Sequence, residues 1–252
     1  MEVFMKNIYR NFAYIYDELM HDVDYKQWID YIEKIFEANK KKPSIIVDLA
    51  CGTGNLTIEM AKKGYDMVGI DISPDMLSCA KQKTMNEGVD VLYLNQDITE
   101  FELYGSVDVA LCLMDSINYI THKSKLKRLF KLVEYYLNPG GLFIFDINSQ
   151  YKLQNVLGEN VFFEIGDDVS YIWQNFYDKR KKMCEFDLTF FIKENSYYKK
   201  YEEVHIEKAY DVFEIKEIIE ESNLRLVRIC DNLTFRKPNK KSERIFFICS
   251  KN

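Results

Sequence analysis

The chain has 252 residues, 47% of them hydrophobic, which is enough to bury a large core without a metal or a disulfide. Its net charge of −6 argues against a general attraction to nucleic acid, and the one basic cluster, at residues 236–241, is expected to be an exposed turn. No segment has the length and apolarity of a signal peptide or a membrane span, and the six cysteines are scattered. These features predict a cytoplasmic protein with reduced thiols, no metal and no membrane partner.

Residues 10–39 are predicted to form two helices at the start of the chain. In the second, Trp28, Ile32 and Phe36 fall on one face at helical spacing, which is typical of a helix packed on a core. The first helix carries Tyr16 among several tyrosines. For these tyrosines, core packing and a role at a ligand remain alternatives.

Residues 45–57, IIVDLACGTGNLT, are predicted to form a buried strand, a tight turn and the first turn of a helix. Gly52 and Gly54 have no Cβ atom, so the backbone can bend sharply there and a ligand can approach its amide groups. The helix start adds unpaired N–H groups. Such a turn, at the carboxyl edge of a parallel sheet, typically receives part of a nucleotide-like ligand.

Strands and helices then alternate with short connections, which predicts βαβ units and a parallel sheet. Ser73, followed by Pro74, is expected to cap a helix, and a later helix is expected to stop at the turn of residues 138–141. The predicted strands of this part are residues 45–48, 67–71, 91–94, 107–113 and 142–147.

An acidic residue lies at or near the carboxyl end of each of these strands, and such ends converge on one crevice. The acids are Asp48, Asp71, Asp97, Asp115 and Asp146. Asp71 ends the strand after the glycine turn, the position from which a carboxylate can accept both hydroxyls of a ribose. For Asp115 and Asp146 we expect plain roles as turn or cap residues.

Residues 151–208 depart from this alternation of strands and helices, because their pattern predicts four antiparallel strands separated by polar turns. We predict an inserted lid and substrate unit over this range, and a core domain made of residues 1–150 and 209–252. In the last part of the chain, a helix near residues 213–219 and strands at 224–230 and 245–250 are expected.

The glycine spacing separates two ligand classes. A nicotinamide dinucleotide fold needs G-x-G-x-x-G, and Thr57 occupies the third glycine position here. The longer string D-x-A-C-G-T-G is similar to the first motif of class I S-adenosylmethionine-dependent methyltransferases, and GIDIS, NQDI and LNPGG resemble their later motifs. The resemblance covers residues 45–148 and 213–250. A nicotinamide-dependent oxidoreductase remains the alternative from another class.

The resemblance implies an α/β fold: a doubly wound, Rossmann-like, seven-stranded and mostly parallel sheet whose last strand is antiparallel, with the inserted antiparallel β lid. It also implies S-adenosylmethionine as cofactor, with the methionine part at the glycine turn, the ribose at Asp71 and the adenine at Asp97 and Ile98. The cofactor-binding residues that it predicts are Tyr16, Asp48, Ala50, Gly52, Gly54, Asp71, Ile72, Asp97 and Ile98.

Within that family, the N-terminal YIYDELMHDVDYKQW and the insertion resemble glycine N-methyltransferase and the sugar-amine N,N-dimethyltransferases. By this resemblance Tyr16 closes over the cofactor, and a small molecule is methylated at nitrogen by in-line transfer in a lidded pocket. Tyr119 is our candidate catalytic residue, able to orient the acceptor or to accept its proton through water, with plain packing as the alternative. None of the three histidines is assigned as a base.

A macromolecular acceptor, RNA or protein, is the second alternative. The acidic balance and the inserted sheet argue against a large nucleic acid, and MDSIN after the fourth strand differs from the Asn/Asp-Pro-Pro-Tyr/Phe string of enzymes that methylate bases. Asp115, Asp146 and Asn148 are not spaced as a metal-dependent catechol-type site requires. The sequence gives no indication of an oligomeric state.

Overall fold

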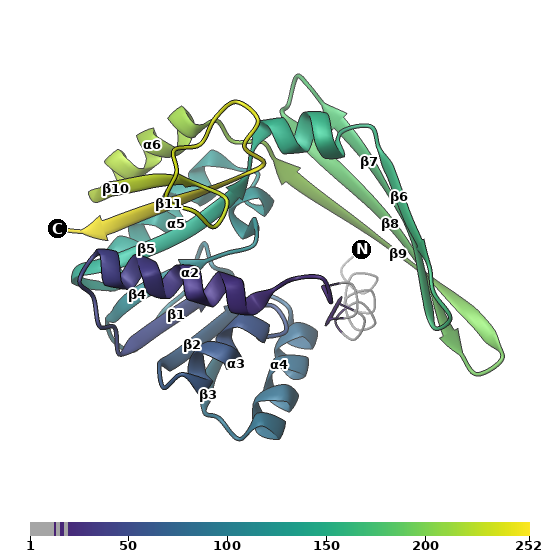
Figure 1. Cartoon of the computed structure of the whole chain (residues 1–252), viewed down its shortest axis with the longest axis horizontal. Helices are drawn as coiled ribbons and strands as arrows, with labels where there is room; N and C mark the ends of the chain where they lie inside the picture. Colours follow the sequence, from purple (N-terminus) through teal and green to yellow (C-terminus); the bar gives the residue numbers. More distant parts are fainter. Residues whose placement is uncertain (1–12, 14–15, 18–19) are drawn as a thin grey trace.

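The computed structural model describes residues 13, 16–17 and 20–252, so most of the first predicted helix lies outside the described residues. A seven-stranded sheet forms the centre of the molecule, in the order β10-β11-β5-β4-β1-β2-β3 (Figure 1). Strands β1 to β5 are parallel, and β11 is antiparallel to both β5 and β10, as predicted. The strands are β1 (Ile45–Leu49), β2 (Asp66–Asp71), β3 (Val91–Asn95), β4 (Val107–Cys112), β5 (Leu137–Asn148), β10 (Leu224–Asp231) and β11 (Arg244–Lys251).

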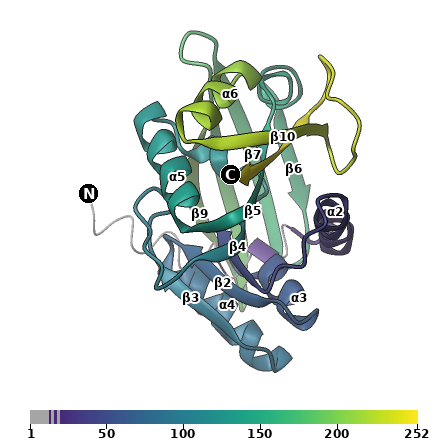
Figure 2. The same cartoon turned by 90° about the vertical axis from the view of Figure 1, so that its left-hand side faces the viewer.

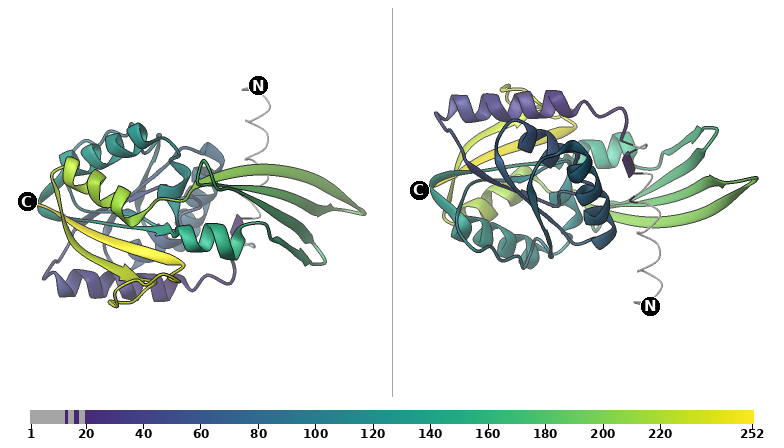
Figure 3. Two further views of the ribbon diagram at one scale, coloured as in Figure 1. Left: turned by 90° about the horizontal axis from the view of Figure 1, so that it is seen from above. Right: turned by 90° about the horizontal axis from the view of Figure 1, so that it is seen from below.

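Helices cover both faces of this sheet and make three layers (Figure 3). Buried side chains of α2 and α3 pack on one face and those of α5 and α6 on the other, while α4 packs beside α3 over β2 and β3. Two short helical segments, η1 (Ser116–Tyr119) and the π-helix η2 (Lys152–Leu157), follow β4 and β5. The α-helices are α2 (Tyr25–Ala38), α3 (Asn55–Lys62), α4 (Pro74–Glu87), α5 (Lys123–Tyr136) and α6 (Val212–Glu221). Among the described helices, none combines the length and the apolarity that crossing a bilayer requires.

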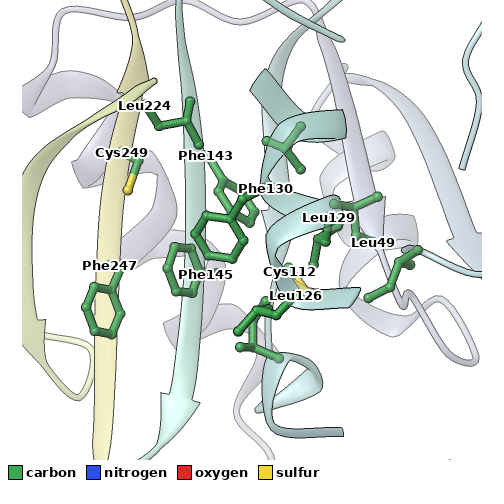
Figure 4. Close-up of a cluster of buried hydrophobic side chains, with 14 of the residues drawn as sticks. Leu49, Cys112, Leu126, Leu129, Phe130, Phe143, Phe145, Leu224, Phe247 and Cys249 are labelled. Atoms are coloured by element: carbon green, nitrogen blue, oxygen red, sulfur yellow. The ribbon is translucent and has the colours of Figure 1, made fainter. Parts of the chain in front are cut away.

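The two faces of the sheet are filled by alternate residues of the same apolar strands. On β5, Phe143 and Phe145 point toward α5, where Phe130 meets both rings edge-on at centroid distances of 5.3 and 5.2 Å (Figure 4). Phe247 of β11 stacks on Phe145 at 5.0 Å. The intervening residues of β5 pack with α2 on the other face. This central, doubly covered position explains why residues 142–145 of the strand are all apolar.

The junction of β2 and α4 forms as the sequence predicts. Ser73 is the N-cap of α4, its hydroxyl accepts a hydrogen bond from the backbone N–H of Met76 at 3.2 Å, and Pro74 occupies the first helical position. Because the cap fixes where the helix begins, Asp71 and Ile72 are held at the carboxyl edge of the sheet.

Residues 138–141 differ from the prediction. We expected Asn-Pro-Gly-Gly to be a turn, but β5 begins at Leu137 and includes these residues. The pairing with β4 shifts register between Val107 and Val109, and Gly140 has a φ of 73°. A Cβ on Gly141 would lie 2.9 Å from the carbonyl oxygen of Asp108, so the glycine allows the irregular strand to stay close to its neighbour.

A second, four-stranded antiparallel sheet projects from the carboxyl edge of the core (Figure 1), so it lies behind the seven-stranded sheet in the view of Figure 2. It matches the antiparallel segment expected from the sequence, and all of its strands fall within the predicted lid unit of residues 151–208. The π-helix η2 connects it to β5, and α6 follows it. Its strands are β6 (Val161–Ile165), β7 (Val169–Asp178), β8 (Met183–Glu194) and β9 (Tyr197–Lys208).

Gly69 of β2 allows a close contact beneath the glycine turn. A Cβ at this position would lie 2.7 Å from Cδ1 of Tyr93 and 2.9 Å from Sγ of Cys51. We therefore expect Gly69→Ala to lower the free energy of unfolding in urea by about 1–3 kcal/mol, because the added methyl group has no space. Gly105→Ala is the matched control, since its Cβ would meet nothing within 4 Å. Equal stability of the two variants would contradict this account.

Candidate functional site

A cavity of about 780 Å³ opens at the carboxyl edge of the seven-stranded sheet, next to β9. Its walls come from the glycine turn after β1, the ends of β2 and β3, the segment after β4, the start of α2 and the strand β9. The cavity therefore lies where parallel α/β sheets bind their ligands. The predicted cofactor residues that line it are Tyr16, Ala50, Gly52, Asp71, Ile72, Asp97 and Ile98.

The two glycines of the turn have different surroundings. Gly52 has a φ of 55°, and a Cβ there would meet nothing within 4 Å, so open space lies beside the backbone at this point. Gly54 is the N-cap of α3 with a φ of 76°, and a Cβ there would lie 2.7 Å from the hydroxyl of Tyr93. Gly52 thus leaves room for a ligand, whereas Gly54 leaves room for the protein's own packing.

Asp71 is held rigidly at the end of β2. Its two carboxylate oxygens accept hydrogen bonds from the backbone N–H groups of Gly52 and Ser73, both at 2.8 Å. Burial raises the pKa of Asp71, and these backbone donors oppose the shift. The carboxylate therefore joins the glycine turn to the start of α4, and it keeps its remaining acceptor positions at the cavity wall.

The neighbouring part of the cavity combines apolar surface with one carboxylate. Ile72 is 66% exposed, and Ile98 and Asp97 line the same cavity. Burial tends to raise the pKa of Asp97, but hydrogen bonds from the backbone and hydroxyl of Thr99, both 2.8 Å, and the charge of Lys125 lower it. Apolar side chains beside a fixed acceptor are suited to a flat heteroaromatic ring.

Asp48 does not line the large cavity. It lies under the turn, where its carboxylate accepts a hydrogen bond from the hydroxyl of Thr57 at 2.5 Å, and burial raises its pKa to about 7. It borders a small adjoining cavity of about 60 Å³, which shares Tyr16, Ala50 and Gly52 with the large one. Thr57, which replaces the third glycine of a dinucleotide motif, thus anchors the turn through Asp48.

Asp17 fastens the Tyr16–Asp17 pair to the glycine turn, which the sequence did not reveal. Its carboxylate accepts hydrogen bonds from Thr53 at 2.6 Å, Asn55 at 2.8 Å and Lys83 at 2.7 Å. Burial alone would raise the pKa of Asp17, and these partners lower it. Tyr16 is thereby placed in the wall of both cavities.

Tyr119, the predicted catalytic residue, lies on the far wall of the large cavity at the end of η1. Its ring meets that of His205 edge-on, with the centroids 5.9 Å apart. The preceding Asn118 is buried and donates hydrogen bonds to the carbonyl oxygens of Asn148 and Lys208, at 3.0 and 2.9 Å. Asn118 therefore joins the loop after β4 to both β5 and β9, and in this way positions Tyr119.

His205 and Glu203 were overlooked in the sequence, where all three histidines looked isolated. Nε2 of His205 lies 2.9 Å from Oε2 of Glu203, and His205 lines the cavity. Residues two apart on a strand share a face, so the Glu-Val-His spacing was the available signal. The sequence does not show that this face of β9 borders the cavity.

Asp115 lies in the turn after β4, at the start of η1, as predicted, whereas Asp146 lies within β5 and is not a turn residue. Both are partners of a largely buried arginine, which was not predicted. The carboxylate of Asp146 accepts hydrogen bonds from the N–H groups of Met114 and Asp115, at 2.7 and 3.0 Å. Arg244 of β11 pairs with both carboxylates and lies 5.2 Å over the ring of Trp28. Asp115 and Arg244 line the cavity.

A polar group behind Asp115 continues toward the inserted sheet. Asn148 donates a hydrogen bond to Glu207 of β9 and accepts one from Lys152 of η2, both at 2.9 Å. Burial raises the pKa of Glu207 well above its usual range, and the charge of Asp115 adds to this; burial lowers the pKa of Lys152. The inserted sheet is thus attached to the core by buried polar contacts.

Several known proteins are similar to this chain in sequence or in fold. A putative methyltransferase of Bacillus subtilis is 35% identical over 246 residues, covering 97% of this chain and 98% of that protein. The crystal structure of an S-adenosylmethionine-dependent methyltransferase from Clostridium acetobutylicum has 37% identity and a TM-score of 0.88, with 96% and 98% of the two chains covered. The fold is shared with a Micromonospora echinaspora amino pentose methyltransferase solved with S-adenosylmethionine bound, at 13% identity, a TM-score of 0.75 and coverage of 95% and 96%.

Residues 46–141 also match the family described as a methyltransferase domain. This match spans the strands and turns that carry Ala50, Gly52, Asp71 and Asp97, and it removes the nicotinamide oxidoreductase alternative. The chain therefore belongs to the class I S-adenosylmethionine-dependent methyltransferases, and it is an enzyme that uses S-adenosylmethionine.

Proposed function

We propose that this enzyme transfers the methyl group of S-adenosylmethionine to a nitrogen of a small molecule bound in the large cavity. One observation carries the proposal: a single cavity of about 780 Å³ extends from Gly52 and Asp71 to Tyr119 and His205. This volume lies in the upper part of the range typical of small-molecule sites, about 300–1,000 Å³, which leaves room for a second ligand beside the cofactor.

The near end of the cavity fits the cofactor. The open space beside Gly52 would receive the methionine part, the fixed carboxylate of Asp71 the ribose hydroxyls, and the surface of Ile72, Asp97 and Ile98 the adenine. When bound, the cofactor supplies an electrophilic methyl group on a sulfonium sulfur, which leaves as a neutral thioether. Because that leaving group needs no proton, the protein's tasks are to align the acceptor, exclude water and take up a proton.

The far end of the cavity is suited to a small polar acceptor. It presents Tyr119, His205 and Asp115, and the inserted sheet borders it through β9. Two segments resemble sugar-amine and glycine N-methyltransferases: the inserted sheet borders this end, and Tyr16 lines the same cavity. An amino pentose methyltransferase has the same fold, which is consistent with a small acceptor that carries an amine.

A transfer assay tests this proposal. The purified chain is incubated with S-adenosylmethionine carrying a labelled methyl group and with glycine, sarcosine, an amino sugar and a nucleotide-linked amino sugar. Parallel reactions contain RNA or protein from a cell extract. We expect label in at least one amine, at nitrogen by mass spectrometry. Label in RNA or protein alone, or cofactor binding without transfer to any amine, would contradict the proposal.

A further inference from the structure

We propose that His205 takes the proton from the acceptor nitrogen and that Glu203 positions the imidazole for this step. The inference rests on the proposed function, because it assigns the proton acceptor for the same cavity. It names residues on the inserted sheet, outside residues 45–148 and 213–250, which carry the resemblance to the class I methyltransferases.

The geometry places an imidazole and a carboxylate together at the cavity wall. Nε2 of His205 lies 2.9 Å from Oε2 of Glu203, and the side chains are 15% and 4% exposed, respectively. Both residues are on the same face of β9, and His205 meets Tyr119 across the cavity wall. An acceptor that contacts Tyr119 is therefore also next to the imidazole.

The carboxylate gives the two ring nitrogens different roles. A neutral imidazole has one N–H donor and one acceptor nitrogen, and the hydrogen bond made by one nitrogen decides which it is. With Glu203 as its acceptor, Nε2 carries the hydrogen, so Nδ1 is the basic nitrogen. Burial raises the pKa of Glu203, and its contact with His205 opposes this. The imidazolium formed when Nδ1 takes up a proton keeps its Nε2–H bond to this carboxylate.

The step balances in atoms and charge. The acceptor amine binds as an ammonium ion, and one of its protons moves to Nδ1 of His205, which becomes an imidazolium paired with Glu203. The freed lone pair on nitrogen forms the new N–C bond as the C–S bond breaks, so the methylated amine starts with one positive charge from the transferred methyl group. The imidazolium then releases its proton to water as the product leaves.

The other ionisable groups of this region have separate tasks. Glu207, the next residue on this face of β9, is hydrogen-bonded to Asn148, and Asp115 is paired with Arg244. Tyr119 faces His205 from η1 and is placed to orient the acceptor. Phe186, the partner of His205 on β8, is not ionisable. Among the described groups, Glu203 is thus a hydrogen-bonding partner of the imidazole that can set its orientation.

Nuclear magnetic resonance tests the pair without any turnover. The chain has only three histidines, so spectra of protein with ¹⁵N-labelled histidine are simple, and His205→Gln identifies the signal of His205. We expect the tautomer with hydrogen on Nε2, and a titration midpoint that moves to lower pH in Glu203→Gln, because the imidazolium loses its carboxylate. Glu202→Gln, one residue away on the opposite face and paired with Lys200, should leave the signal unchanged.

Kinetics with the panel amine that reacts fastest supply the second readout. We expect His205→Gln to lower kcat/KM for the amine by at least about 100-fold, while calorimetry shows S-adenosylmethionine affinity within about threefold of wild type. Its pH profile should lose the fall at acid pH that the imidazole imposes and keep the fall at alkaline pH, where the free amine is no longer an ammonium ion. Glu203→Gln should lower kcat/KM by about tenfold or more, and its fall at acid pH should move to lower pH. Glu202→Gln should match wild type in both respects.

Each outcome decides between the proposals. An unchanged rate and pH profile in His205→Gln would overturn the proton-transfer role while leaving amine methylation intact. If no panel amine reacts although the cofactor binds, the proposed function fails, and the resonance experiment still decides on the pair. If His205 carries its hydrogen on Nδ1, or if its signal does not respond to Glu203→Gln, the assignment of Glu203 as the positioning residue is overturned.

Discussion

Replacing Asp71 with asparagine is expected to weaken S-adenosylmethionine binding at least about 100-fold. The carboxylate accepts hydrogen bonds from Gly52 and Ser73 and is proposed to accept the ribose hydroxyls as well. Asparagine has the same shape, but its NH₂ group would face one of these donors, and the charge is lost. Hydrogen bonds to charged groups contribute about 1.5–3 kcal/mol each, so losing two of them removes about 3 kcal/mol or more.

Calorimetric titration of wild type and variant with the cofactor measures this effect. Asp66→Asn is the matched control, because Asp66 lies on the same strand at the opposite edge of the sheet and does not line the cavity. We expect the control to bind as wild type does. Wild-type affinity in Asp71→Asn would contradict the assignment of the ribose to Asp71.

Replacing Arg244 with methionine is expected to lower the free energy of unfolding by about 3 kcal/mol or more at neutral pH. Arg244 is 15% exposed and compensates Asp115 and Asp146, of which Asp146 is completely buried. Methionine fills part of the volume but leaves the buried carboxylate of Asp146 and the partly exposed one of Asp115 without Arg244. Urea denaturation followed by circular dichroism measures the loss, and Arg225→Met, an exposed residue of β10, is the control.

The pH dependence of this loss has a defined sign. Burial alone would raise the pKa of Asp115, but Arg244 lowers it, so the wild-type pair stabilises the fold above the unfolded pKa of the carboxyl group and loses this contribution as the pH falls. Burial raises the pKa of Asp146 in spite of Arg244. Without the arginine both carboxyl groups would take up protons at higher pH, and the loss of their negative charge reduces the destabilisation of the variant. The stability difference should therefore shrink from pH 7 toward pH 4, and a constant difference would contradict this explanation.

The elements of the fold were predicted well where local patterns are strong. The strand ends, the cap at Ser73 and the four antiparallel strands after residue 160 follow from apolar periodicity, capping residues and turns, which act over a few residues. The segment of residues 138–141 was predicted wrongly, because a Pro-Gly-Gly string is typical of a turn. The residues on either side of it, Leu137 and Leu142, pair with Val107 and Val109 of β4 and keep it in β5 as an irregular stretch, and sequence spacing does not show such pairing.

The end of the cavity that we propose for the cofactor was largely predictable because its residues come from consecutive strand–turn–helix units. Once the strands are parallel and adjacent, the ends of β1, β2 and β3 must lie at one edge. Ala50, Gly52, Asp71 and Asp97 therefore reach the same cavity for a reason visible in the sequence. Asp48 and Gly54 belong to the same string, and only the packing shows that they support the turn from beneath.

The sequence by itself determined the fold class, the family and the cofactor, because these depend on local motifs and their order along the chain. Only the tertiary structure decided which acids, bases and cations meet. Arg244 reaches Asp115 across 129 positions, and His205 reaches Tyr119 from a different sheet. Such pairs depend on the register between distant strands and on the way the inserted sheet attaches to the core. Contacts of that kind are selected by packing and by the burial of charge, neither of which has a fixed spacing in sequence.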